Sequence, residues 1–224
     1  MTIRVHVFDA GGHFGRALPR IRRTIAAAIE HVRASSTLEN VDIAVHPADF
    51  GSDQFPISAF TTGPHNIHIG IERSQLRSED LEEELYRSTV HELHHALRWR
   101  YLGARWTVGE TVVLEGLALL ADHAAAGPED FTDRPLADPA RAISHLKNIQ
   151  GEQVSHHRAW LYSPEEAQPG AAARVYTLGT LLMTATLQEV DLDPWAAAEH
   201  PADDLLDKGF SALDILLRHR KKTA

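Results

Sequence analysis

The stretch SEDLEEELYRSTVHELHHALRWRYLG, residues 78 to 103, marks the point where the hydrophobic pattern changes from alternating to helical. It opens with Ser78, a helix-capping residue type, carries acidic residues in its first turn and stops at Gly103, and these are helix start and stop signals. Residues 107 to 127 also have helical spacing and are nearly apolar all round, as in a buried helix. The sequence predicts two successive long helices here.

The residues before this stretch have the pattern of strands. Residues 3 to 8 and 41 to 45 alternate between apolar and polar side chains, and residues 55 to 72 give further strand signal. Residues 16 to 36 have apolar side chains at helical spacing with basic ones opposite. We expect a small twisted sheet with one crossing helix.

The residues after the helix pair are mainly helical by the same criterion. Helices are expected at 138 to 149, 171 to 190 and 202 to 220, separated by loops near 128 to 137 and 164 to 170. Strands followed by helices are typical of an α+β fold.

The length of 224 residues suits one well-buried core. We therefore predict a single domain over residues 1–224. Residues 1–77 would be mainly strands with one helix, residues 78–127 the helix pair, and residues 128–224 a helical region.

Composition narrows the classes of function. Lys and Arg number 22 against 31 Asp and Glu, a net charge of −9 without a dense basic cluster, which argues against a nucleic-acid partner. There is no apolar run long enough for a membrane span or a signal peptide. The absence of Cys agrees with a reducing compartment and removes thiolate chemistry. We expect a cytoplasmic protein with no membrane partner; its oligomeric state is undetermined.

The sequence HELHH at 91 to 95 is the main chemical signal. Because each helical residue turns by about 100°, His91 and His95 lie on one face, and Glu92 lies to one side of them. This is the H-E-x-x-H geometry, in which two imidazoles bind one zinc ion and the glutamate acts on water. The motif lies among apolar residues, where these polar groups would be costly unless paired or ligating.

A catalytic zinc ion needs a third protein ligand. Tyr101 stands where an extended motif would have a third histidine, so a carboxylate of the next helix is the remaining choice among Glu110, Glu115 and Asp122. Glu115 is preferred because its neighbours are apolar, and the adjacent Gly116 would let two backbones approach closely. Asp122 could orient a ligand but is interpreted as a solvated residue.

These motifs resemble a known group of enzymes. HELHHALRWR followed about twenty residues later by EGLA is similar to the HExxH-plus-Glu metallopeptidases called gluzincins, and more narrowly to a family of predicted zinc-dependent proteases of uncharacterised role. The likeness extends to NIHIGI before the helix and VYTLGTLL at 175 to 182. It implies a zincin-like fold in which His91, His95 and Glu115 bind Zn²⁺ and Glu92 is the catalytic base.

Peptide hydrolysis also needs a donor for the developing oxyanion. Tyr176 is our first choice, and His156 and His157 are alternatives because SHHRAWLYS has the size of a cleft-lining loop. The strand NIHIGI could offer an open edge to an extended peptide substrate. FDAGGHFG, residues 8 to 15, resembles a dinucleotide loop with Ala10 for the first glycine, but no suitably placed acidic residue supports that interpretation.

Together these residues predict a zinc metallopeptidase that acts on a peptide or protein substrate. The rival hypothesis is a non-catalytic zinc-binding protein that serves as a partner-binding or regulatory module. Glu92 favours the enzyme, because a structural zinc site has no use for a base beside the metal.

Overall fold

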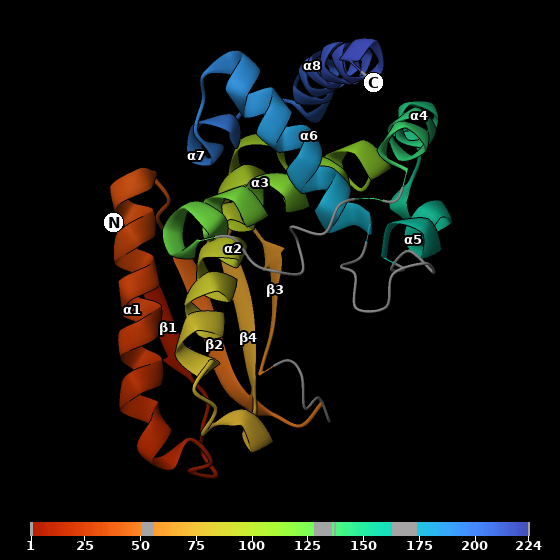
Figure 1. Cartoon of the computed structure of the whole chain (residues 1–224). Helices are drawn as coiled ribbons and strands as arrows, with labels where there is room; N and C mark the ends of the chain where they lie inside the picture. The colour runs from red at the N-terminus through yellow and green to blue at the C-terminus, as the bar shows by residue number, and fades with distance from the viewer. Residues whose placement is uncertain (1, 51–55, 128–135, 137, 163–173, 224) are drawn as a thin grey trace. The chain divides into compact units, whose positions relative to one another are not determined.

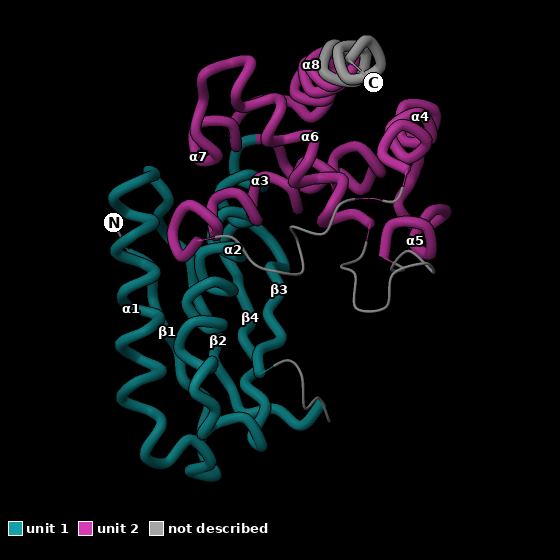
Figure 2. The backbone as a smooth tube through the Cα atoms, in the orientation of Figure 1, with its two compact units in different colours: residues 1–101 teal, residues 102–224 magenta. Residues whose placement is uncertain are grey.

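The computed structural model describes residues 2–50, 56–127, 136, 138–162 and 174–223, with the side chains of the last helix described through Asp214. The chain divides into two compact units, residues 1–101 and 102–224 (Figure 2). The boundary falls at the C-terminal end of the first of the two long helices that the sequence predicts. The prediction of one domain stays a prediction, and the loops expected near 128 to 137 and 164 to 170 lie outside the described residues apart from Leu136.

The first unit is built on a four-stranded sheet of order β1-β2-β4-β3 (Figure 1). β1 pairs in parallel with β2, β2 in parallel with β4, and β3 antiparallel with β4. The strands are β1 (Ile3–Val7), β2 (Val41–Ala48), β3 (Ile57–Gly63) and β4 (Asn66–Glu72). Alternate residues are buried along β2 and through the first part of β4, so one face of the sheet holds the core.

Helices α1 (Leu18–Ser35) and α2 (Leu81–Leu102) pack against that face (Figure 1). α1 buries Ile21, Ile25, Ile29 and Val32, one side chain per turn, as its spacing predicted. Two short 3₁₀ helices, η1 (Gly15–Ala17) and η2 (Arg73–Gln75), follow β1 and β4. α2 buries residues around most of its circumference, which explains why its apolar stripe is weak in the sequence.

The second unit consists of helices. Its elements are α3 (Val108–Ala126), α4 (Pro139–Ile149), α5 (Val154–Tyr162), α6 (Arg174–Val190), α7 (Pro194–Ala197) and α8 (Ala202–Thr223). α3 begins at Thr107, whose hydroxyl accepts a hydrogen bond from the Glu110 amide, and ends at Gly127, where φ is 89°. α3 packs against α6 and α8 around a continuous apolar core.

The crossing of α3 and α6 is set by two glycines. A Cβ atom on Gly116 would lie 2.4 Å from the carbonyl oxygen of Gly179, and one on Gly179 would lie 2.6 Å from that of Val112. Gly116 does permit a close backbone approach, as its sequence context suggested, and the helix that approaches is α6.

The predicted α+β class is confirmed, with the strands first and the helices after them. α5 and α7 were not expected as helices. The expectation that NIHIGI forms an open edge is wrong, because β4 pairs with β2 on one side and β3 on the other, and the edge strands are β1 and β3. None of the helices in the described part of the chain combines the length and apolar character needed to cross a membrane.

Candidate metal centre

The first unit brings together on α2 three side chains of the types that can bind a metal ion. The rings of His91 and His95 have centroids 4.5 Å apart and are inclined at 79°. A ligand atom from each ring and a carboxylate oxygen of Glu92 all lie within 4.8 Å of one another. Imidazole nitrogens and carboxylate oxygens are zinc ligands, so these residues fit a divalent ion of that kind.

Burial constrains this cluster. Glu92 and His95 expose only 6% and 7% of their surface, and His91 is half-buried. A carboxylate in such surroundings needs a polar partner. The partner is Thr61 on β3, whose hydroxyl donates to Glu92 Oε2 at 2.7 Å and lies 3.0 Å from the Glu92 carbonyl oxygen.

In the second unit, the candidate carboxylates lie along α3. Glu115 is half-buried, whereas Glu110 and Asp122 each expose only 3% of their surface. The interpretation of Asp122 as solvated is therefore wrong, because the helix is enclosed on nearly all sides. Burial by itself does not favour Glu115 over these two. Glu115 directly precedes Gly116, the residue at which α3 meets α6.

Two tyrosines of the second unit are relevant to the site: Tyr176 lies near the α3–α6 crossing, and Tyr162 lies near Glu115. Tyr176, on α6, is one turn before Gly179 and is half-buried against the apolar core. Tyr162, at the end of α5, was not anticipated from the sequence. Partial burial raises the pKa of Tyr162 to about 12, and the negative charge of Glu115 contributes to this shift, so the phenol lies within electrostatic range of Glu115.

The histidine-rich segment is a helix and not the loop that was expected. Leu161 is fully buried and Val154 packs against the core seven residues earlier, a spacing that places both on one helical face. His157 Nε2 lies 2.7 Å from Glu152 Oε2, and His156 is exposed. The alternative roles of these histidines as oxyanion donors stay predictions.

A comparison with protein families gives one match. The family described as "Predicted Zn-dependent protease (DUF2268)" matches residues 21–207, most of the chain. The chain belongs to this family. Searches of curated proteins and of solved structures gave no significant match.

The family match covers most of each unit and includes His91, Glu92, His95, Glu115 and Tyr176. His91, Glu92 and His95 were found from the sequence, and the first unit brings them together. The roles of Glu115 and Tyr176 stay predictions. Thr61 and Tyr162 were missed: no motif marks Thr61, because its contact with Glu92 joins residues 31 positions apart.

Proposed function

We propose that this protein is a zinc-dependent peptidase in which His91 and His95 bind the metal and Glu92 is the general base. The observation that carries the proposal is the gathering of these three side chains within 4.8 Å on one buried helix. Membership of a family described as predicted zinc-dependent proteases agrees with it.

Glu115 completes the ligand set in this proposal, which makes the site of the gluzincin type on a zincin-like fold. Catalytic zinc sites have three protein ligands and one position for water or substrate. Glu115 has apolar neighbours in the sequence, and it lies in the EGLA segment that is similar to the gluzincins. Glu110 lies in the first turn of α3, where the helix dipole stabilises a carboxylate. Its position is therefore explained without a metal ion.

Each residue then has a chemical task. The metal would acidify a water molecule toward a pKa of about 7 and polarise the substrate carbonyl. Thr61 holds Oε2 of Glu92 and so orients this carboxylate. Glu92 would take the proton of the attacking water and pass it to the leaving amine. Tyr176 would donate to the oxyanion.

The edge strand β3 is the proposed binding site for the substrate. The hydrogen bond from Glu72 N to Pro56 O, 2.9 Å, sets the alternation of the β3–β4 ladder. Ala59 and Thr61 therefore direct their main-chain N–H and C=O groups away from β4. An extended peptide could pair with them, and Thr61 contacts Glu92, so this peptide would run beside the base.

The test of the function is Glu92→Gln compared with the wild type, with zinc content and hydrolysis of a peptide library measured on both. We expect zinc to be retained and hydrolysis to fall about 10²- to 10⁴-fold, the usual contribution of a general base. Loss of zinc from the variant would make Glu92 a ligand. Zinc binding without hydrolysis by the wild type would favour the non-catalytic module.

Substitutions at Ala59 test the proposed substrate-binding site on β3. Ala59→Pro removes an outward N–H, so KM for peptides should rise while zinc content is unchanged. Ala59→Val keeps that N–H and is the matched control. Equal KM values for the two folded variants would exclude substrate binding along β3.

A further inference from the structure

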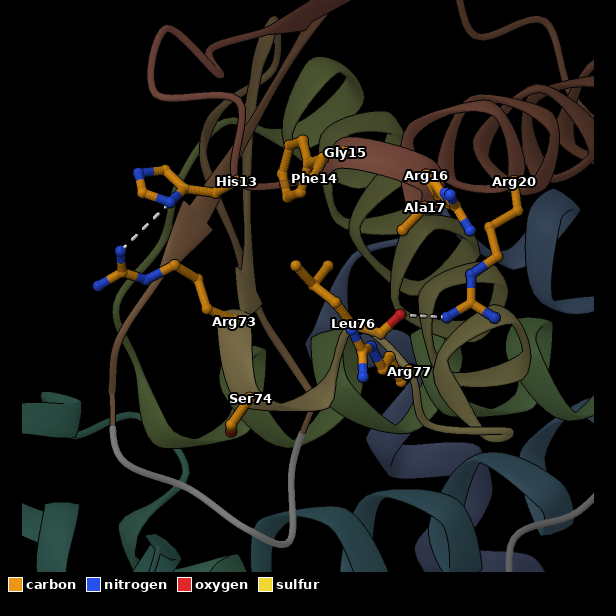
Figure 3. Close-up of a pocket in the computed structure, with 10 residues that line it drawn as sticks. All are labelled: His13, Phe14, Gly15, Arg16, Ala17, Arg20, Arg73, Ser74, Leu76 and Arg77. Carbon is orange, nitrogen blue, oxygen red and sulfur yellow. Dashed lines mark hydrogen bonds between the residues drawn. The ribbon is translucent and has the colours of Figure 1, made fainter.

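The first unit contains a pocket of about 1020 Å³ whose lining residues all lie outside the histidine motif (Figure 3). It is lined by two segments, the turn that leads from β1 into α1 and the segment that follows β4. β1 and β4 both run parallel to β2, so their carboxyl ends lie at the same edge of the sheet. Crevices at this edge commonly bind ligands in sheets of parallel strands.

The lining of this pocket is strongly basic. Arg16 and Arg20 come from the first segment and Arg73 and Arg77 from the second, and His13 lies beside Arg73 (Figure 3). Four arginines around one pocket stand out in a chain whose net charge is −9. A pocket lined in this way attracts an anion.

Two of the four arginines are held by protein partners. Arg73 Nε donates to Asp49 at 2.6 Å, and Arg20 donates to the Leu76 carbonyl oxygen. Asp49 also forms an ion pair with Arg73, and Glu82 Oε1 lies 3.9 Å from Arg20 Nε, so carboxylates offset part of the positive charge of these two arginines. Within the described part of the chain, Arg16 and Arg77 form no hydrogen bond or ion pair. Their guanidinium groups can therefore turn to a ligand.

The glycine-containing turn does not act as a dinucleotide loop. Asp9 accepts hydrogen bonds from the His13 amide at 2.7 Å and the Phe14 amide at 3.1 Å. Those amides are thus used within the turn, whereas a dinucleotide loop presents its backbone to a pyrophosphate. Guanidinium groups, not backbone amides, are the donors available to an anion here.

We propose that this pocket binds a small molecule carrying phosphate groups. Guanidinium groups pair with phosphate oxygens in a bidentate manner, and the tetrahedral group offers acceptors to several arginines that approach from different sides. The volume is that of a small-molecule site, about 300 to 1,000 Å³, and is larger than a single inorganic ion needs. The ligand class is an organic phosphate.

The test is calorimetric titration of the full chain with pyrophosphate, and with citrate as a polycarboxylate of similar charge. We expect pyrophosphate to bind, and the double variant Arg16→Ala/Arg77→Ala to weaken it about tenfold or more through the loss of two charge-assisted contacts. Arg22→Ala/Arg23→Ala is the matched control, because it removes the same charge from exposed positions of α1 outside the pocket. Circular dichroism checks that both variants fold.

Three results would overturn the proposal. They are no binding of pyrophosphate, equal weakening by the two double variants, and citrate binding as tightly as pyrophosphate. The first two exclude the pocket as an anion site, and the third excludes phosphate selectivity. The test needs neither zinc nor peptide hydrolysis, so its outcome is independent of the proposed peptidase function.

Discussion

The two units supply their candidate residues in different ways. In the first unit, His91, Glu92 and His95 lie within five residues of one helix, so the turn of the helix alone sets their arrangement. In the second unit, Glu115 and Tyr176 are about sixty residues apart on two helices that cross at glycines. Local periodicity can specify the first arrangement, whereas only packing between distant segments can produce the second.

This difference predicts different kinds of failure. A substitution in the α2 cluster removes a chemical group and leaves the helix intact. A substitution at the α3–α6 crossing changes the separation of two backbones and moves every side chain that they carry. The following variants test this contrast, beginning with the largest expected effect.

Removing a ligand should abolish hydrolysis. His95→Ala should lower zinc affinity by more than about a hundredfold, because changes at residues that merely support ligands already cost about 10- to 100-fold. Glu115→Gln should have a comparable effect if Glu115 is the third ligand, and Glu110→Gln is its control. Zinc affinity is measured by competition with a chelating dye. Weaker zinc binding in Glu110→Gln than in Glu115→Gln would reassign the third ligand.

Removing the oxyanion donor should lower kcat with little change in KM. Tyr176→Phe is expected to reduce kcat about 10²- to 10³-fold, as the loss of one oxyanion donor does in other hydrolases. Tyr162→Phe is the informative comparison, because the negative charge of Glu115 acts on the Tyr162 phenol. Steady-state kinetics on one peptide decides between them, and a larger loss in Tyr162→Phe would transfer the role to Tyr162.

The helix crossing should be sensitive to a single methyl group. Gly116→Ala places a Cβ 2.4 Å from backbone, so the unfolding free energy should fall by roughly 2 kcal/mol despite alanine's better helix propensity. Gly151→Ala, where a Cβ meets nothing within 4 Å, is the control. Urea unfolding measures both. Equal stabilities would mean that the helices can separate at little cost.

The smallest effect is expected at Thr61. Thr61→Val removes the hydrogen bond to Glu92 but preserves shape, so kcat should fall about tenfold while zinc content stays constant. Thr62→Val, at the exposed neighbouring position, should leave kcat within about twofold of the wild type. An unchanged kcat in Thr61→Val would show that Glu92 does not depend on β3 for its orientation.

The sequence alone determined much of the fold and the first half of the site. Alternation marked the strands, and helical spacing marked α1, α2, α3, α4, α6 and α8. His91, Glu92 and His95 were found because an i, i+4 pair keeps its geometry wherever a helix forms. These features depend on residues that are close in the chain.

Tertiary structure decided the features that join distant residues. The sheet order placed β3 at one edge and β4 inside the sheet, because strand pairing depends on crossover connections that local patterns do not encode. The contact from Thr61 to Glu92, the α3–α6 crossing and the pocket between Arg16 and Arg77 each bring together segments at least 31 residues apart. The spacing of apolar residues in the sequence indicates which face of a helix or strand is buried. Only the folded chain determines which other residues that face contacts.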